Sequence, residues 1–258
     1  MKLTYFGTGA AEGIPAVFCS CDTCRKSREL GGKNLRTRSQ ALLNDELLID
    51  FPPDSFMHAL RANLDLMKIS NLVITHSHQD HFYPDEFVFR YPGFSHGDNP
   101  ALQIYGNERV KERYESIVAQ NPQVQDIDKY LHYNFVEPFK PFMLNDIKVT
   151  PLLANHDKRE NCYIYIFEQD LKRILYANDT GFFPRSTYDY IQGIRFDLVS
   201  LDCTMASIKE GTNHMGIPDN VELCNKLQEL GCLDSRLTKT VLTHFSHNGR
   251  MIHEEIVK

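Results

Sequence analysis

Five short apolar runs in this 258-residue sequence are each followed almost at once by histidine or aspartate. The apolar runs are typical of β-strands, and the residues after them are THSHQDH after Ile74, ANHD after Leu153, ANDTG after Tyr176, DCT after Leu201 and THFSH after Leu242. In layered α/β folds, ligands bind at the edge where the strands end. We therefore expect these polar side chains to gather at one edge of the sheets.

The remaining elements predicted from the sequence complete a layered α/β protein. Residues 1–6 are typical of a strand, and QALLNDELLID at 40–50 predicts a hairpin that turns at Asn44-Asp45. Further strands are expected at 72–75, 102–105, 147–154, 163–167, 173–177, 196–201 and 240–243, and helices at 55–67, 107–119, 186–192 and 218–230. Hairpins mixed with strand–helix alternation predict mixed sheets. No repeat or linker marks a boundary, so residues 1–258 are expected to form one domain.

The charge of the chain limits the classes of partner. A formal net charge of −6 and a pI near 6.0 argue against a broad basic face for nucleic acid, although a small anionic substrate is compatible with them. The sequence shows no signal peptide and no apolar run of about 18 residues, so a cytoplasmic protein without a membrane partner is expected. A homodimer is left open.

The segment THSHQDH at 75–81 packs three histidines and an aspartate into six positions. His76 and His78 are two residues apart, so on an extended segment they point the same way and can share one ion. Asp80 and His81 follow after the chain has turned and aim at a second point. Because clustered histidines repel one another when protonated, this cluster predicts metal binding.

Additional ligands for two metal ions are expected from other strand ends. A lone histidine is usually a hydrogen-bonded polar residue. His156 and His244 are predicted to be metal ligands only because the cluster at 76–81 already predicts a metal site. The predicted arrangement has His76, His78 and His156 on one ion, Asp80, His81 and His244 on the other, and Asp179 bridging them. Imidazole and carboxylate ligands suit zinc, manganese or iron.

The ordered set from His76 to His244 resembles the metallo-β-lactamase superfamily over nearly the whole chain. This resemblance implies an αβ/βα sandwich, with two mixed β-sheets packed face to face, helices outside and a metal pair at one edge. A bridging aspartate at the position of Asp179 is a feature of the hydrolase and phosphodiesterase branches. Antibiotic-cleaving members have a different residue there, so β-lactamase activity is not expected.

A second cluster, FCSCDTC, places Cys19, Cys21 and Cys24 in a C-x-C-x-x-C spacing. Three thiolates this close suit one tetrahedral zinc ion with a fourth ligand from elsewhere, for which His247 is the candidate. The alternative is a set of merely reduced cysteines, as expected in a reducing compartment. The other four cysteines show no such spacing and are interpreted as core residues.

The combination GTGAAEGIPAVFCSCDTCRKSRE and LTHFSHN resembles the phosphoribosyl 1,2-cyclic phosphate phosphodiesterase (PhnP-like) family. That resemblance implies a structural zinc site made by cysteines and by a histidine that follows shortly after the last histidine of the catalytic metal site. A protein of pyrroloquinoline quinone biosynthesis carries a similar cysteine cluster. The cluster alone therefore does not identify the substrate.

Two bridged metal ions lower the pKa of a water molecule and offset the charge that builds up on a phosphodiester. The catalytic set predicted with them is His214, Asp80 and Asp202. His214 is the candidate general acid, by its place between a strand end and a helix and by the family resemblance. Its alternative is a capping or surface histidine. Asp202 is expected to orient a ligand histidine.

The function predicted from these residues is a metal-dependent phosphodiesterase that opens a cyclic phosphate on ribose 5-phosphate to ribose 1,5-bisphosphate. The alternatives are a tRNA 3'-end endonuclease with the same ligands, or a metal-binding protein of the pyrroloquinoline quinone type. The basic stretch of residues 25–38 is expected to be a solvated loop, with phosphate recognition by one or two of its residues as the alternative. RYPGFSHGDNP at 90–100 is expected to be an exposed loop.

Overall fold

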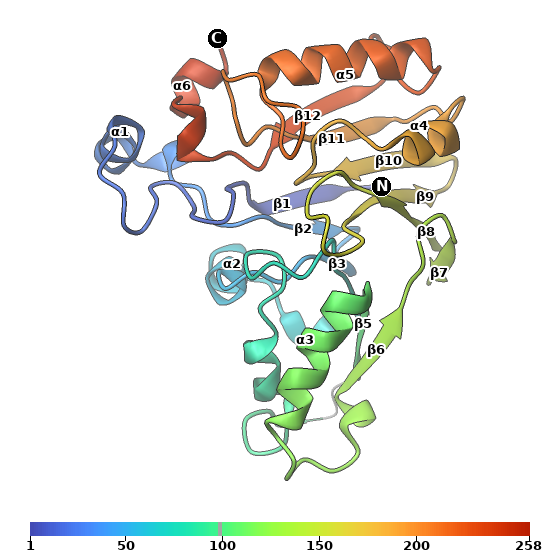
Figure 1. Ribbon diagram of the computed structural model, residues 1–258. Helices are drawn as coiled ribbons and strands as arrows, with labels where there is room; N and C mark the ends of the chain where they lie inside the picture. The colour runs from blue at the N-terminus through green and yellow to red at the C-terminus, as the bar shows by residue number, and fades with distance from the viewer. Residues whose placement is uncertain (98–99) are drawn as a thin grey trace. The chain divides into compact units, whose positions relative to one another are not determined.

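A computed structural model describes residues 1–97 and 100–258, so part of the loop expected at 90–100 lies outside the described residues. The chain forms two compact units. Unit 1 consists of Met1–Gly7 and Ser39–Glu137, and unit 2 consists of Thr8–Arg38 and Pro138–Lys258. Each unit contains one six-stranded β-sheet with its helices (Figure 1).

The sheet of unit 1 has the order β1-β2-β3-β4-β5-β6. Its strands are β1 (Leu3–Gly7), β2 (Gln40–Leu43), β3 (Leu47–Ile49), β4 (Asn71–Val73), β5 (Leu102–Gly106) and β6 (Leu131–Phe135). The first three pair antiparallel, and β3 to β6 pair parallel, so the sheet is mixed. Because β3 and β4 are parallel, the residues that follow both strands meet at the same edge.

Helices cover one face of this sheet. They are α2 (Ser55–Ala62), α3 (Glu108–Ala119) and the 3₁₀ segments Leu66–Lys68, Pro84–Arg90 and Ile127–Lys129. Alternate strand residues such as Leu72 and Ile104 are buried and form one core cluster with Val110 and Tyr114 of α3. The Asn107 side chain caps α3 by accepting hydrogen bonds from the backbone N–H groups of Arg109 and Val110, both 2.9 Å long.

The sheet of unit 2 has the order β12-β11-β10-β9-β8-β7. Its strands are β7 (Phe142–Leu144), β8 (Ile147–Leu153), β9 (Tyr163–Gln169), β10 (Lys172–Ala177), β11 (Leu198–Asp202) and β12 (Lys239–Thr243). The strands β10, β11 and β12 pair parallel, whereas β7 to β10 pair antiparallel. β8 therefore runs in the same direction as β10, and all four strands that precede histidine or aspartate end at one edge.

The helices of unit 2 are α1 (Asp22–Leu30), α4 (Arg185–Ile191), α5 (Ile217–Glu229) and α6 (His253–Ile256), with 3₁₀ segments at Gly32–Asn34 and His247–Gly249. Leu223 and Leu227 of α5 and Ile191 of α4 are fully buried against Leu175 and Leu201 of the sheet. Figure 1 shows α4 and α5 along the strands β9 to β12.

Most elements agree with the sequence-based expectation, and the differences have local causes. The helix expected at 55–67 ends at Ala62, because Asn63 takes the left-handed conformation with φ of 50° that terminates helices. Sequence reasoning missed α1, β6 and β7. The basic stretch at 25–38 is not a solvated loop, because residues 22–30 form α1 and Arg36 is half-buried.

Among the helices of the described residues, none combines the length and the apolar composition needed to cross a bilayer.

Candidate metal sites

In unit 1, the cluster at 76–81 is held by Asp50, a residue that sequence reasoning missed. Asp50 follows β3 directly, and its Oδ1 accepts hydrogen bonds from the backbone N–H of Thr75 at 2.8 Å and from the Thr75 hydroxyl at 3.0 Å. The other oxygen, Oδ2, lies 2.8 Å from Nδ1 of His81. Asp50 and His81 are completely buried, so this carboxylate fixes both the start of the segment and its last histidine.

The contact with Asp50 leaves Nε2 of His81 available as a ligand atom. A carboxylate can only accept a hydrogen bond, so Nδ1 of His81 carries the proton. Nε2 lies 3.2 Å from Oδ2 of Asp80, so these two predicted ligands face a common point. The ring of His76 lies next to both other histidines, with ring centroids 4.5 Å from His78 and 4.3 Å from His81.

The His-x-His segment has a second support in unit 1. The guanidinium group of Arg113, on α3, donates a hydrogen bond to the backbone carbonyl of Ser77. Ser77 lies between His76 and His78, so the hydrogen bond fixes the backbone that carries both rings. Asp50 could have been found from the sequence because it follows the apolar run LLI, whereas no sequence pattern points to Arg113.

In unit 2, the carboxylate of Asp179 is the point on which three predicted site histidines converge. Its Oδ2 lies 3.3 Å from Nε2 of His156 and 3.8 Å from Nε2 of His244. Its Oδ1 lies 3.1 Å from Nδ1 of His214. One ligand atom from each of Asp179, Asp202, His214 and His244 lies within 4.8 Å of the others.

A glycine allows the loops that carry these residues to approach one another. The backbone N–H of Gly181 donates to the carbonyl of Asn155 at 2.9 Å, which joins the Asp179 turn to the segment that carries His156. A Cβ atom at Gly181 would lie 2.4 Å from the carbonyl oxygen of Thr212, in the loop before His214. Only glycine permits this approach, so residue 181 sets the spacing of the three segments.

The orientation of His244 is set by Asp202 and Thr204. Nδ1 of His244 lies 2.8 Å from the Thr204 hydroxyl oxygen and 3.3 Å from Oδ2 of Asp202. Nε2 is the atom that faces Asp179. Oδ1 of Asp202 also accepts hydrogen bonds from the backbone N–H groups of Thr204 at 3.0 Å and Met215 at 2.8 Å. Asp202 therefore joins the His244 strand end to the loop of His214.

The loop of His214 is organised by Glu210, another residue that sequence reasoning missed. One Glu210 oxygen accepts hydrogen bonds from three consecutive backbone N–H groups, those of Thr212, Asn213 and His214. The side chain of His214 is 24% exposed, whereas that of Asp179 is 3% exposed. His214 is therefore the more accessible of the two.

The charges of this cluster act on one another. Burial by itself disfavours the charged imidazole, but the hydrogen bonds and negative charges of Asp179 and Asp202 outweigh it and raise the pKa of His214 to about 11. Burial of Asp202 favours the neutral acid, yet hydrogen bonds from His214 and His244 hold its pKa below the ordinary value. Two buried carboxylates need nearby positive charge, which imidazolium groups or a divalent cation can supply.

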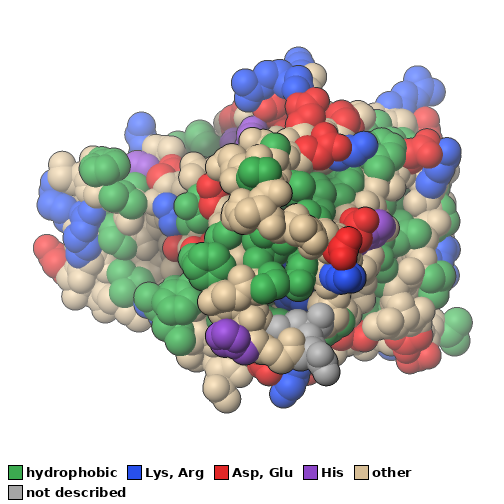
Figure 2. Space-filling model, turned by 90° about the horizontal axis from the view of Figure 1, so that it is seen from below, with side chains coloured by type: hydrophobic (Ala, Val, Ile, Leu, Met, Phe, Trp, Pro, Cys, Tyr) green, Lys and Arg blue, Asp and Glu red, His purple; other side chains and the backbone are tan. Residues whose placement is uncertain are grey.

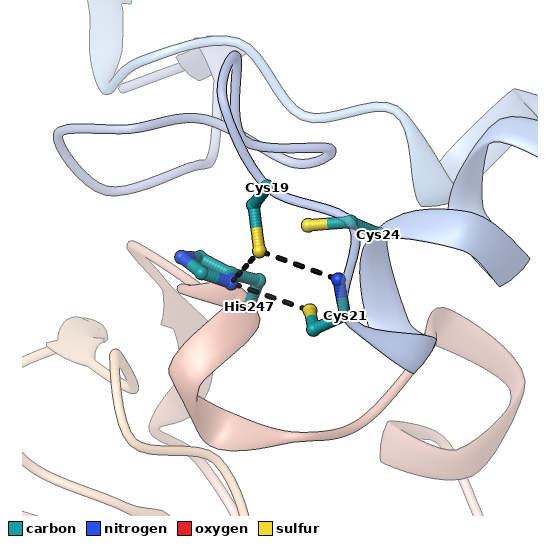
Figure 3. A group of neighbouring side chains, drawn as sticks. All are labelled: Cys19, Cys21, Cys24 and His247. Atoms are coloured by element: carbon teal, nitrogen blue, oxygen red, sulfur yellow. Dashed lines mark hydrogen bonds between the residues drawn. The ribbon is translucent and has the colours of Figure 1, made fainter.

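The cysteine cluster lies entirely within unit 2, and Figure 3 shows its four side chains pointing toward one another. Nδ1 of His247 lies 3.5 Å from Sγ of Cys19 and 3.5 Å from Sγ of Cys21. One ligand atom of each of Cys19, Cys21, Cys24 and His247 lies within 4.8 Å of the others. Three sulfurs and one imidazole nitrogen match the donor set of a structural zinc site.

The arginines after this cluster hold the cysteine-rich loop. Arg28, on α1, donates hydrogen bonds to the carbonyls of Cys19 at 3.0 Å and Ala16 at 3.1 Å, and Arg25 donates to the carbonyl of Ser20 at 2.8 Å. The guanidinium of Arg36 lies 4.3 Å from the ring centroid of Phe245, next to His244. These arginines satisfy backbone carbonyls and stack on an aromatic ring.

Comparison with models of protein families identifies the family of this chain. A family model described as a β-lactamase superfamily domain matches residues 46–245, more than half of the chain. The chain belongs to the metallo-β-lactamase superfamily. The superfamily and the α/β fold class with two mixed sheets, both expected from the sequence, are therefore confirmed.

Curated relatives of this superfamily member carry different names. An octanoyltransferase of Porphyromonas gingivalis is 24% identical over 99% of this chain, and the match covers 48% of that protein. A ribonuclease Z of Oceanobacillus iheyensis is 32% identical over 45% of this chain and 34% of that protein. The chain spans between about a third and a half of the length of the curated relatives it matches.

Solved structures of the superfamily share the fold. A diphosphatase from the PhnP family has a TM-score of 0.73 at 24% identity, covering 98% of this chain and 89% of that one. The short form of human tRNase Z has a TM-score of 0.66 at 18% identity, covering 95% and 93%. Zinc-bound PqqB from Methylobacterium extorquens has a TM-score of 0.64 at 15% identity, covering 98% and 83%.

Proposed function

We propose that residues 1–258 act as one metallo-hydrolase domain, a dinuclear metal-dependent phosphodiesterase. The observation that carries this proposal is the geometry of Asp179, whose Oδ2 faces His156 and His244 while its Oδ1 faces His214. A carboxylate with two ligand histidines at one oxygen and a proton donor at the other is suited to bridge two cations beside that donor. The family model runs from unit 1 into unit 2, which supports treating the two as one functional domain.

The ligand assignment follows the order of the superfamily residues along the chain. His76, His78 and His156 are assigned to one ion, and Asp80, His81 and His244 to the other, with Asp179 as the bridge. The tautomers of His81 and His244 support this assignment, because Asp50 holds Nδ1 of His81 and Thr204 holds Nδ1 of His244. Nε2 of each ring is left to bind metal. Bound divalent ions would supply an activated water and offset phosphoryl charge.

In this proposal His214 donates the proton that the leaving alkoxide requires. Its Nδ1 is held by Asp179 and Asp202, at 3.1 Å and 3.5 Å, which orients the ring. These carboxylates favour the imidazolium form, and the partly exposed ring can reach a substrate. Asp202 contacts both His214 and His244, so it orients two members of the site.

We assign the cysteine cluster to one structural zinc ion held by Cys19, Cys21, Cys24 and His247. The donor set and its convergence support zinc over a disulfide framework. His247 lies three residues after His244, so the same segment serves both sites. The proposed substrate is a cyclic phosphate of a ribose phosphate, supported by the resemblance of both sequence clusters to PhnP-like enzymes.

The test measures metal content together with hydrolysis of bis(p-nitrophenyl) phosphate and 5-phosphoribosyl 1,2-cyclic phosphate. Asp80→Ala is expected to lose metal and activity. His214→Gln is expected to keep its metal but to lose about 10²- to 10⁴-fold in kcat, the usual contribution of a general acid. His132→Ala, which replaces a half-exposed histidine of β6, is the control and should behave like the native chain. A fully metallated native protein that hydrolyses neither ester would overturn the proposal and favour a metal-binding, non-enzymatic role.

A nuclease is the second candidate, because three relatives named ribonuclease Z match 45% to 66% of this chain. On the face seen in Figure 2, the described Lys and Arg side chains lie in small groups among Asp and Glu, and they form no broad basic area there. Cleavage of a precursor tRNA at a rate exceeding that on the cyclic sugar phosphate would favour this candidate.

A further inference from the structure

Glu12 lies in the loop between β1 and the cysteine cluster, and one of its oxygens contacts three consecutive residues near the C-terminal end of the chain. Oε1 of Glu12 lies 3.2 Å from Nε2 of His247. The same oxygen accepts hydrogen bonds from the Ser246 hydroxyl at 2.7 Å and from Nδ2 of Asn248 at 3.1 Å. All of these residues belong to unit 2.

The contact with Glu12 determines which nitrogen of His247 can bind a metal. An ionised carboxylate only accepts hydrogen bonds, so Nε2 of His247 must carry a proton to pair with it. Nδ1 then keeps its lone pair, and Nδ1 is the atom that lies 3.5 Å from Sγ of both Cys19 and Cys21. A histidine ligand whose second nitrogen donates to a carboxylate is held in one ring orientation and becomes a more basic ligand.

We propose that Glu12 is the positioning residue of the cysteine–histidine zinc site. It does not bind the ion itself. Its carboxylate holds Nε2 of His247 so that Nδ1 faces the sulfurs, and its negative charge strengthens the imidazole as a ligand. This inference rests on the assignment of zinc to the cysteine cluster under the proposed function, and it goes beyond that assignment by adding a residue that tunes the affinity.

A purely structural role for Glu12 is the competing explanation. Backbone hydrogen bonds already join its loop to the His247 segment, because Ala10 N–H donates to the Phe245 carbonyl and Phe245 N–H donates to the Thr8 carbonyl, both at 2.9 Å. Ser246 and Asn248 add two side-chain ties through the same Glu12 oxygen. If Glu12 only holds the two segments together, removing the hydrogen bond of Ser246 should weaken Zn²⁺ binding as well. If Glu12 orients His247, removing that hydrogen bond should leave Zn²⁺ binding unchanged.

The experiment compares the full chain with Glu12→Ala, Glu12→Gln and the matched control Ser246→Ala. The probe is Co²⁺, whose thiolate charge-transfer absorption reports the cysteine cluster and not a histidine–carboxylate site. Zn²⁺ is then titrated against this absorption in the presence of a chelator. A cavity of about 810 Å³ lined by Cys21 and His247 gives the chelator access to the cluster.

Glu12→Ala is expected to weaken Zn²⁺ binding at the cluster by about 10- to 100-fold, the usual effect of losing such a partner. Glu12→Gln keeps an acceptor oxygen but loses the charge, so the Zn²⁺ affinity of this variant should lie between that of the native chain and that of Glu12→Ala. Ser246→Ala should bind like the native chain. Unchanged affinity in Glu12→Ala, or an equal loss in Ser246→Ala, would overturn the role of Glu12. A native chain without the cobalt–thiolate absorption would instead overturn the zinc assignment beneath it.

Discussion

The hydroxyl oxygen of Thr204 lies 2.8 Å from Nδ1 of His244, and both side chains are buried. The single hydroxyl proton of Thr204 can go to Oδ2 of Asp202 at 2.8 Å or to the carbonyl of His244 at 2.9 Å. In either case the oxygen is free to accept a hydrogen bond from Nδ1. The proton of His244 is therefore placed on Nδ1, and Nε2 is left as the ligand atom that faces Asp179.

Replacing Thr204 by valine removes this acceptor while keeping the size of the side chain. We expect Thr204→Val to weaken the affinity of the active site for divalent metal by about 10- to 100-fold, because Nδ1 of His244 loses its nearer acceptor and keeps only the 3.3 Å contact with Asp202. The measurement is a metal titration with a competing chelator, followed by hydrolysis at saturating metal. Thr204→Ser keeps the hydroxyl and is the control. Equal affinity in the valine variant and the native chain would contradict this role of Thr204.

Glu210 holds the backbone of residues 212–214 and should act on the rate through His214. We expect Glu210→Gln to lower kcat by about 10-fold, because a small misplacement of a reacting group costs rate more than it costs binding. KM and metal content should change little. The measurement is a full kinetic profile with bis(p-nitrophenyl) phosphate.

Glu222→Gln is the matched control for Glu210. Glu222 of α5 is 59% exposed, and its carboxylate pairs with Lys209, the residue before Glu210. This variant should keep the native kcat. If Glu210→Gln retains native kcat as well, the hydrogen bonds to residues 212–214 do not position the general acid.

The candidate site residues of unit 2 could be predicted from the sequence because their geometry depends on strand direction. Parallel pairing of β10, β11 and β12 brings Asp179, Asp202 and His244 to one edge, and each follows an apolar run that is visible in the sequence. Position along a strand is therefore enough to predict that these side chains are neighbours.

The residues that orient the ligands could not be predicted in the same way. Thr204, Glu210 and Glu12 are ordinary polar residues in loops, and their partners depend on the path that each loop takes. Asp50 is an exception, since it follows an apolar run and carries the same signal as Asp179. The helix α1 was missed because the run of basic residues at 25–38 favoured a solvated loop, although the first turn of the helix begins directly after Cys21.

Gly181 should not tolerate even a methyl group. A Cβ atom there would meet the backbone of Thr212 at 2.4 Å, and backbone cannot move aside as a flexible side chain can. We expect Gly181→Ala to lower the free energy of unfolding by about 1–3 kcal/mol, as overpacking does. Activity should fall further, because the turn of Asp179 is pushed from the loop of His214. Thermal unfolding and kcat measured on the metallated protein check this. An unchanged Tm would show that the loops can separate freely.

His58 is a buried histidine outside the metal sites, in unit 1. It is 2% exposed, and its Nδ1 lies 2.7 Å from Oε1 of Gln40. Burial lowers the pKa of His58 to about 4 from the ordinary value of 6.5, with nearby Asp54 opposing the shift and Arg61 adding to it. Between these values the unfolded chain binds a proton that the folded chain does not.

The stabilisation from neutral His58 is therefore complete above pH 6.5 and is lost as the pH falls toward 4. One pKa unit corresponds to about 1.4 kcal/mol, so the loss over this window is on the order of 3 kcal/mol. We expect His58→Gln to be less stable at pH 7, because its ring packing is gone, but to lose less stability between pH 6.5 and 4 than the native chain. Denaturant unfolding at several pH values measures how the free energy of unfolding changes with pH, as a slope for the native chain and for His58→Gln. Identical slopes for His58→Gln and the native chain would mean that folding does not lower the pKa of His58.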